Sequence, residues 1–281
     1  MRFRSTATLL AATAAFIAAP SLAQEAPEDN VFDRDHITVG VGAGYVPSYR
    51  GSDDYVVSPV PIVRGSVWGV DINPRLGGVA LDFVPDAKDA RVGLTLGPVA
   101  TASFNRRNQI KDDVVRAAGK LDTAVEVGVS AGVSFYRLLS PYDSLSITTD
   151  VKWDVAGAYS GMTYTPVVSY TTPLSPALLA TVAVSARHVD DDYASYYYSV
   201  TPEQSARSGL PTYGAEGGWD TGSATLLLGY DLSGDLRSGG WAVFGVANYS
   251  KMLNDGKDTP FTSIRGDADQ WAFGAGVAYT F

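Results

Sequence analysis

The chain contains no cysteine, which excludes disulfide bonds, thiolate metal ligands and a cysteine nucleophile. Histidine is almost absent as well, since only His36 and His188 occur among the 281 residues. Ser185 lies three residues before His188, so in a strand the two side chains would point to opposite faces and form no nucleophile–base pair. No P-loop, zinc signature or nucleophile elbow is present. We therefore expect a protein without enzymatic activity, metal or cofactor; a Ser185–His188 hydrolase is the weaker alternative.

Basic residues are scarce, with 21 Lys and Arg against 30 Asp and Glu and a formal net charge of −9. Phosphate binding needs clustered positive charge, so nucleic acid is excluded as a partner. Long apolar runs are missing too. After residue 23 no run of about 18 apolar residues occurs, so we expect no transmembrane helix. A membrane location would then require a closed β-barrel.

The first 23 residues have the pattern of a secretory signal peptide. Arginines occupy positions 2 and 4, residues 7–19 are apolar, and Ser21 to Ala23 form a small-residue cleavage site. We expect cleavage after Ala23, with an uncleaved anchor helix as the alternative. Residues 24–35 are polar and acidic, and we expect a periplasmic lead-in with little structure. A single domain over residues 36–281 would follow.

The final stretch, WAFGAGVAYTF (residues 271–281), alternates without a break between two kinds of residue. Side chains alternate across a strand, so one face is large and apolar and the other is nearly bare. Such a strand, ending on a phenylalanine, indicates the closing strand of a barrel in lipid. Residues 36–45 repeat the pattern, with glycines on the bare face, as expected if the first and last strands pair.

The same alternation recurs along the rest of the chain and predicts about twelve strands. We place them at residues 36–45, 55–65, 67–73, 78–84, 90–104, 123–136, 145–155, 161–172, 177–188, 222–232, 240–249 and 271–281. Pro59 and Pro61 cannot donate to a ladder, and both missing donors fall on the same edge. This spacing predicts a strand that is locally unpaired or bulged.

The connections between these strands differ in length according to the side on which they fall. With both termini periplasmic, the outer connections are residues 47–54, 74–77, 105–120, 157–160, 189–221 and 253–269, and three of them are long. The inner connections are all short, an asymmetry typical of outer-membrane barrels. The sequence therefore predicts an all-β, transmembrane, antiparallel up-and-down barrel in the outer membrane of a Gram-negative bacterium. Its outer wall would contact lipid and lipopolysaccharide; a soluble β-sandwich is the alternative.

Charged residues on the inward faces of the predicted strands are the best candidates for a functional site. In residues 145–155, three of them alternate with large apolar residues, and charges cost little only on the face away from lipid. We interpret the set as an ion-pair network that fills a narrow lumen, with a small charged conduit as the alternative. The set comprises Glu126, Asp150, Lys152, Asp154, Arg187 and Asp231.

Acidic pairs and triplets stand in the predicted outer loops. Clustered carboxylates suit divalent cations, although such runs are more often simply solvated. Solvation is our favoured interpretation, and cation binding is the alternative. The residues are Asp53, Asp54, Asp112, Asp113, Asp190, Asp191, Asp192, Asp267 and Asp269.

Two stretches carry a family resemblance. Residues 39–65 join a glycine-rich strand to a YRGSDDY loop and a PVP strand, and residues 196–219 contain SVTPEQSARSGLPTY. With the C-terminal strand, they resemble the MipA/OmpV family of outer-membrane proteins. The resemblance implies a non-enzymatic barrel that acts as a scaffold between a lytic murein transglycosylase and a murein synthase. Porin-like and adhesive roles are the family's alternatives.

The second of these motifs also predicts local structure. Thr201, Pro202 and Gln204 form a capping box with proline at the first helical position, and Gly209 can end the helix. We therefore expect one short helix at about residues 202–208 in a long outer loop, preceded by an extended piece, Tyr196 to Val200. The loop would stabilise the rim as an Ω-like structure; a plug or ligand gate is the alternative.

The last strand carries one further resemblance. Phe281 and Tyr279, with Gly276 behind them, are similar to the C-terminal signal that the barrel-assembly machinery recognises. Position 274 is glycine, where a polar residue is usual. We expect this machinery to be a partner of the chain.

Overall fold

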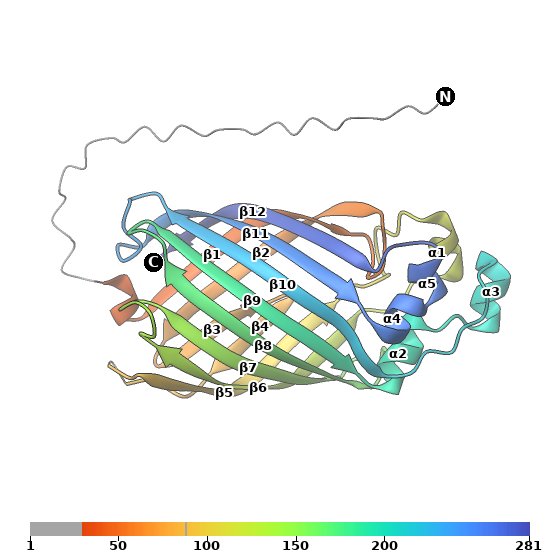
Figure 1. The fold of residues 1–281 in the computed structure, drawn as a ribbon, viewed down its shortest axis with the longest axis horizontal. Coiled ribbons are helices and arrows are strands. Elements are labelled where there is room, and N and C mark those ends of the chain that lie inside the picture. Colours follow the sequence, from red (N-terminus) through yellow and green to blue (C-terminus); the bar gives the residue numbers. More distant parts are fainter. Residues whose placement is uncertain (1–29, 88) are drawn as a thin grey trace, which may run out of the picture.

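The computed structural model describes residues 30–87 and 89–281, and twelve strands in this part of the chain close into one antiparallel barrel (Figure 1). The predicted signal peptide lies outside the described residues. The strands are β1 (His36–Pro47), β2 (Tyr55–Val67), β3 (Val70–Arg75), β4 (Gly78–Asp82), β5 (Val92–Ser103), β6 (Ala124–Tyr136), β7 (Ser144–Asp154), β8 (Met162–Pro173), β9 (Leu178–Val189), β10 (Gly218–Asp231), β11 (Gly240–Met252) and β12 (Asp269–Thr280).

The seam of the barrel is the pair β1–β12. Their register runs from Thr38 opposite Thr280 to Tyr45 opposite Phe273, and the Phe281 N–H extends the ladder to the Ile37 carbonyl at 2.8 Å. Every other strand pairs with its neighbours in sequence. The predicted barrel, its strand number and the pairing of first and last strands are confirmed.

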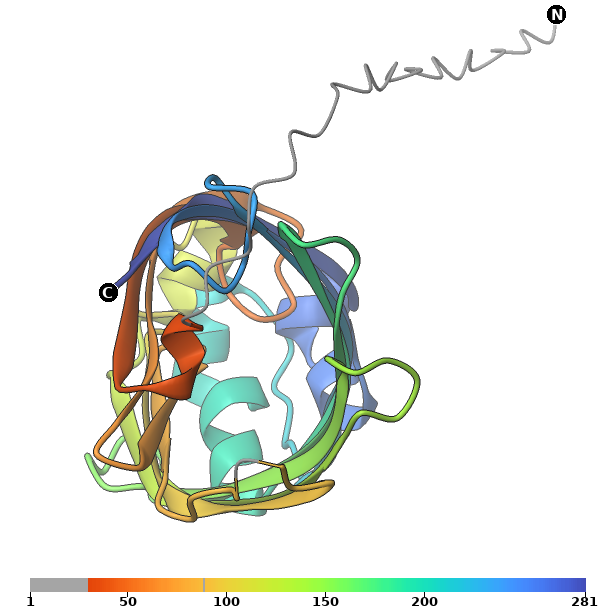
Figure 2. The same ribbon diagram turned by 90° about the vertical axis from the view of Figure 1, so that its left-hand side faces the viewer.

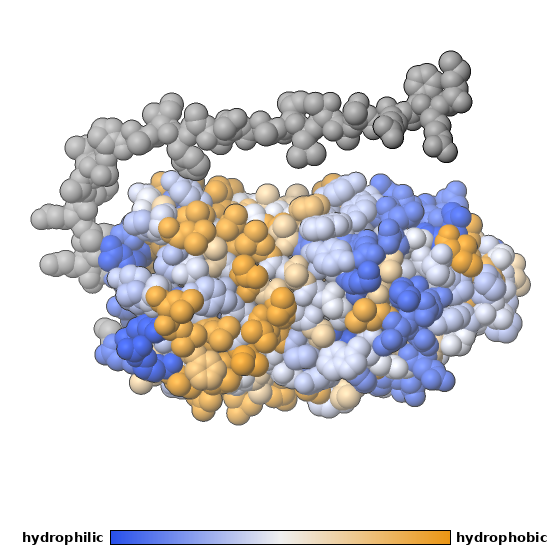
Figure 3. Space-filling model, viewed as in Figure 1, coloured by the Kyte–Doolittle hydropathy of each residue, from blue (hydrophilic) through white to orange (hydrophobic). Residues whose placement is uncertain are grey.

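Because side chains alternate along each strand, the wall has an outward face of large apolar residues and, at the seam, an inward face of glycines and small residues. Outward side chains such as Val41, Leu94 and Phe273 are exposed. Hydrophobic residues gather in a band nearer the end of the barrel that carries the C-terminus (Figure 3). On the inward face of the seam, glycines leave room for a single ring: a Cβ on Gly276 would lie 2.5 Å from Phe244 Cζ. The bare strands therefore accommodate a side chain from β11.

The short turns and the five α-helices lie at opposite ends of the barrel, whereas η1 lies at the end with the short turns (Figures 1 and 2). The described helices are η1 (Val31–Asp33), α1 (Asp113–Ala118), α2 (Asp191–Tyr198), α3 (Pro202–Ser208), α4 (Asn254–Asp258) and α5 (Pro260–Ser263). The five α-helices all belong to the longer connections. None of the helices in residues 30–87 and 89–281 is long and apolar enough to cross a membrane.

Two local predictions need correction, and the structure adds a short turn to the predicted lead-in. Helix α3 has the predicted bounds and its complete capping box, but it is not the single outer helix. Tyr196 to Tyr198, predicted as extended, belong to α2, because Asp190 caps that helix by accepting the Tyr193 N–H at 3.0 Å. The described part of the lead-in contains η1, which is tied to the barrel by the Val31 N–H donating to the Arg237 carbonyl at 2.9 Å.

The wall is incomplete beside β2. On one edge β2 pairs with β1 from Tyr55 to Ser66, whereas on the other it pairs with β3 only from Gly65 to Val67. The β3–β4 hairpin is short and ends at Leu76 and Gly77. The predicted unpaired strand around Pro59 and Pro61 is therefore confirmed.

Candidate functional site

The inward residues of β5, β6 and β7 meet in a buried polar cluster. Lys152 on β7 forms a salt bridge with Glu126 on β6, and its Nζ donates to Thr101 Oγ1 on β5 at 2.9 Å. The Thr101 hydroxyl in turn donates to Glu126 Oε2 at 2.9 Å, and the Tyr159 hydroxyl donates to Oε1 at 2.9 Å. Both carboxylate oxygens are thus occupied, so this predicted pair is a closed ion pair.

A second ion pair lies on the same side of the lumen. Arg75 at the end of β3 binds Asp150 on β7 with two hydrogen bonds, Nε to Oδ2 at 2.6 Å and Nη2 to Oδ1 at 3.2 Å. The same Nη2 donates to Ser130 Oγ at 3.1 Å. Two parallel hydrogen bonds of this kind fix the guanidinium plane of Arg75 relative to the carboxylate plane of Asp150. The sequence interpretation missed Arg75 because it assigned residues 74–77 to a connection.

The third ion pair lies near the helical end. Arg187 on β9 donates from Nε to Asp220 Oδ1 at 2.9 Å and from Nη2 to Oδ2 at 2.5 Å. The Tyr198 hydroxyl of α2 donates to the same Oδ2 at 2.6 Å. Asp220 occupies a register shift between Trp219 and Thr221, which turns its side chain towards Arg187. The sequence interpretation placed Asp220 in a loop and so missed it.

Asp154 and Asp231 do not join these pairs. Asp154 ends β7 and accepts the backbone N–H groups of Ala156, Tyr159 and Ser160 at 2.8–3.0 Å. Asp231 ends β10 and accepts the Ser233 N–H at 2.8 Å. Both carboxylates therefore shape turns, one at each end of the barrel. Ser185 points inward, opposite Ser223, while His188 packs edge-on against Trp219 on the outer face. The structure keeps these two residues apart.

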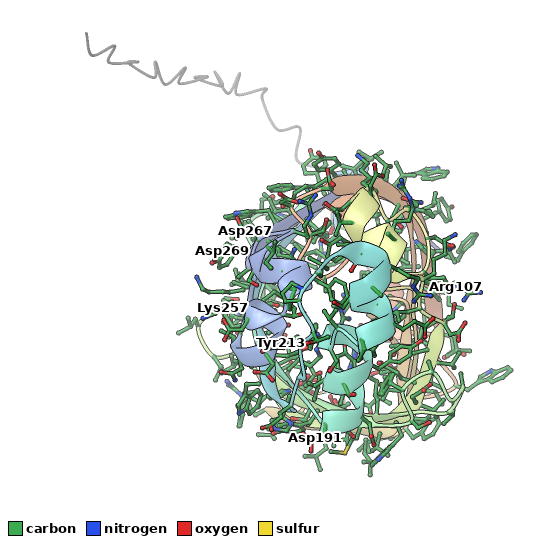
Figure 4. All side chains as sticks on the ribbon, turned by 90° about the vertical axis from the view of Figure 1, so that its right-hand side faces the viewer. Arg107, Asp191, Tyr213, Lys257, Asp267 and Asp269 are labelled. Carbon is green, nitrogen blue, oxygen red and sulfur yellow. The ribbon has the colours of Figure 1, made fainter. Side chains whose placement is uncertain are left out.

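The outer connections fold together into what we name the outer cap: residues 48–54, 104–123, 190–217 and 253–268. Figure 4 shows its helices lying across the end of the barrel, with Arg107, Lys257, Asp267 and Asp269 around the rim. Two apolar clusters hold it together. One contains Leu121, Ala124, Tyr159, Val189, Tyr193, Ala194, Tyr197, Tyr198, Ala215 and Met252, and the other contains Tyr49, Ile110, Val115, Ala118, Val200, Leu210 and Phe261.

Arg106 connects three of the four cap segments. Its guanidinium carbon lies 3.7 Å from the centre of the Phe261 ring, and its nitrogens donate to the carbonyls of Tyr197 at 3.3 Å and Gly119 at 3.4 Å. It is buried, and within the described residues it has no ion-pair partner. Burial lowers the pKa of Arg106 to about 10.

The acidic loop residues serve mainly as caps and ion-pair partners. Asp112 caps α1 by accepting the Val115 N–H at 2.8 Å and binds Arg265 at 2.6 Å. Burial raises the pKa of Asp112, but hydrogen bonds from Arg265 and Val115 outweigh it and hold the pKa below the ordinary 3.8. Asp269 pairs with Lys251. Over residues 30–87 and 89–281, no group of three or more His, Cys, Asp or Glu is arranged to hold a metal ion.

The three residues of the C-terminal pattern lie together at the seam. Phe281 is exposed, and its ring stands edge-on to Tyr279 with 4.6 Å between the centres. Tyr279 also contacts Trp241 of β11. Gly276 faces inward beneath Phe244. This corner presents an aromatic surface on the lipid side.

A sequence model of the family described as "MltA-interacting protein MipA" matches residues 39–281. The MltA-interacting protein of Escherichia coli (strain K12) is 23% identical over 254 residues, which cover 87% of this chain and 90% of that protein. The outer membrane protein OmpV of Vibrio cholerae is 26% identical over 214 residues, covering 76% of this chain and 75% of that protein. The COG4313 outer membrane channel from Pseudomonas putida F1 is 14% identical, with a TM-score of 0.45 and coverage of 94% and 100%.

Proposed function

Since the chain belongs to the MltA-interacting protein family, we propose that it is a non-enzymatic outer-membrane scaffold whose periplasmic end docks a murein-remodelling enzyme. The name of the Escherichia coli relative states an interaction with MltA. In outer-membrane barrels the short turns face the periplasm. A murein enzyme would therefore meet the end of this barrel that carries the short turns, η1 and the C-terminus.

The observation that carries the proposal is a set of apolar side chains at the tips of those turns. Trp68, in the β2–β3 turn, is 91% exposed, and Leu139, in the β6–β7 turn, is 85% exposed. Leu174, in the β8–β9 turn, is 61% exposed. Exposed apolar residues on several turns at the same end of the barrel give a partner protein apolar surface to cover.

The β6–β7 turn is also rigid. Asp143 accepts the backbone N–H groups of Leu138, Leu139 and Ser140 at 2.7, 2.8 and 3.0 Å, and the Tyr170 hydroxyl at 2.6 Å. A turn held in this way presents Leu139 in one position, which lowers the entropy lost when a partner binds.

The experiment is crosslinking followed by purification from cells. We expect the unaltered chain to co-purify with a lytic transglycosylase or a murein synthase, and the double variant Trp68→Ser, Leu139→Ser to lose that partner. Ile264→Ser is the matched control, because Ile264 is an exposed apolar residue of the outer cap. Absence of both enzyme classes from the unaltered sample would refute the scaffold.

The orientation has its own test. Protease added to intact cells should cut residues 190–217 and leave residues 137–143 uncut. The reverse pattern would place the cap in the periplasm and move the docking surface to it.

A small-solute pore is the second candidate, favoured by the polar inward faces of β5 to β7. Planar-bilayer recordings of the purified protein would show defined steps, altered in Lys152→Ala, because that change removes the cation beside Glu126. A silent bilayer would remove this candidate.

A further inference from the structure

The break in the wall beside β2 is bounded by named residues. From Tyr55 to Arg64, the edge of β2 that faces away from β1 has no strand partner among the described residues. The opposite side is formed by the tip of the β3–β4 hairpin, where the Ala102 N–H donates to the Gly77 carbonyl at 2.9 Å. The Arg50 N–H donates to Asn105 Oδ1 at 2.9 Å and joins the two cap segments above.

This break lies at the depth of the hydrocarbon. Tyr45 and Tyr55 stack with 4.9 Å between their ring centres at the outer ends of β1 and β2. Aromatic pairs of this kind mark the membrane interface. The unpaired residues begin just below that pair, and Val57 is 65% exposed on the outward face. Leu76 at the hairpin tip is 90% exposed.

An unpaired strand edge in hydrocarbon is costly, because each free N–H and C=O lacks a partner. The Ile37 carbonyl accepts the N–H of Phe281, the residue after β12. The backbone groups of the odd-numbered residues of β1 therefore point towards β12 and away from β2. Their odd-numbered partners on β2 therefore direct their backbone groups to the free edge. Two of these residues, Pro59 and Pro61, have no N–H to leave unsatisfied.

The same two prolines oppose occupation of the edge by another strand. An added strand needs donors at alternate positions, and two successive ones are missing here. The edge is therefore suited to remaining free, not to pairing with a second copy or a partner chain.

The inward face of β2 changes from apolar to cationic next to the break. Val60 and Ile62 lie opposite Gly42 and Gly40 of β1, and the Phe244 ring from β11 lies against Gly42, so the neighbouring wall is apolar. Arg64 follows on the same face, opposite Thr38. It is exposed to the lumen, and within residues 30–87 and 89–281 no hydrogen bond or ion pair holds it; Asp71 is its electrostatic neighbour.

We propose that this break is a lateral portal through which small amphipathic carboxylates pass between the membrane and the barrel interior. The apolar tail lies along Val60 and Ile62, beside the apolar wall formed by Gly40 and Phe244. Arg64 binds the carboxylate, because a guanidinium forms charge-assisted hydrogen bonds with such a group. Because the outer cap lies across the end of the barrel, the portal offers the lumen a route to lipid that does not pass through that end. This passage is independent of the proposed docking at the periplasmic end.

The first experiment uses the absence of native cysteine. Val60→Cys places a thiol inside the wall beside the break. Thr148→Cys is the matched control, because Thr148 also faces inward but its strand is paired on both sides, with Gly132 and Val167. Each variant, checked for heat-modifiable folding, is reconstituted in vesicles and treated with N-dodecylmaleimide, which resides in lipid, or with a charged maleimide.

We expect N-dodecylmaleimide to label Val60→Cys several-fold faster than Thr148→Cys, while the charged reagent labels the two at similar rates. Equal rates with N-dodecylmaleimide would overturn the portal. So would a Val60→Cys thiol that is protected in native outer membranes but reactive after purification, because a partner chain would then cover the edge.

The second experiment tests the ligand class with dodecanoate and dodecanol, bound to the protein in nanodiscs. Arg64→Gln should weaken dodecanoate binding about tenfold, because a charge-assisted hydrogen bond is lost. Dodecanol binding should be unchanged. Equal losses for both probes, or none for either, would overturn the assignment of the carboxylate to Arg64.

Discussion

Arg187 on β9 and Asp220 on β10 form a two-point ion pair that also receives the Tyr198 hydroxyl of the outer cap. The contact joins the barrel wall to the cap. Asp220 reaches Arg187 because it is the additional residue at a register shift between the two strands. One buried carboxylate therefore contributes to the stability of the cap, beside the two apolar clusters.

Removing that carboxylate should release the cap. Asp220→Ala leaves the Arg187 charge buried without a partner, and such losses cost about 3–5 kcal/mol. We expect faster proteolysis of residues 190–217 and a lower unfolding midpoint. The double variant Arg187→Met, Asp220→Leu should recover most of the loss, since no uncompensated charge remains. If both variants lowered the unfolding midpoint equally, the loss would come from altered packing and not from the unpaired charge of Arg187.

Acid should loosen the cap through Asp112. Its pKa is lower in the folded protein than the ordinary 3.8, because Arg265 and the Val115 N–H stabilise the carboxylate. A lowered folded pKa contributes stability above the unfolded pKa, and this contribution is lost as the pH falls through the folded value. Proteolysis of residues 104–123 should thus accelerate below about pH 4. In Asp112→Asn this acid-dependent step should be missing; its persistence there would assign it to another group.

Two glycines of the last strand provide a matched pair of substitutions. A Cβ on Gly276 would lie 2.5 Å from Phe244 Cζ and closer still to the Val41 carbonyl oxygen, whereas a Cβ on Gly274 has no neighbour nearer than 3.7 Å. Gly276→Ala should therefore lower the free energy of unfolding by roughly 1–3 kcal/mol, the usual cost of overpacking. Gly274→Ala should change it little. Urea titrations of the refolded barrel would measure both, and similar midpoints would contradict the close packing at the seam.

Deleting Phe281 should impair insertion into the outer membrane but leave secretion intact. The deletion removes the hydrogen bond to the Ile37 carbonyl and the aromatic contact with Tyr279. Heat-modifiable barrel in outer-membrane fractions is the measurement. Phe32→Ala is the control, because Phe32 is an exposed aromatic residue outside the strands. Normal barrel from the deletion variant would contradict the proposed assembly role of Gly276, Tyr279 and Phe281.

The amino-acid sequence by itself determined the barrel. Period-two alternation in residues 271–281 and in the other strands is a local property, and it identified the wall, its two faces and the seam. The capping box at Thr201 and Gln204 is equally local, so the bounds of α3 could be predicted. The prolines at 59 and 61 located the unpaired edge, because a missing donor is a property of the residue itself.

Only the tertiary structure decided which charged residues meet. Lys152 and Glu126 could be assigned to one inward face, but the register of β6 and β7 is needed to place them in contact. Arg75 reaches Asp150 across 75 residues, and Asp220 turns inward through a bulge that alternation does not contain. The contacts within the outer cap join residues even farther apart in the sequence, because Arg106, Tyr197 and Phe261 come from three different loops. Their side chains acquire partners only when the strands have closed and brought the loops to one end.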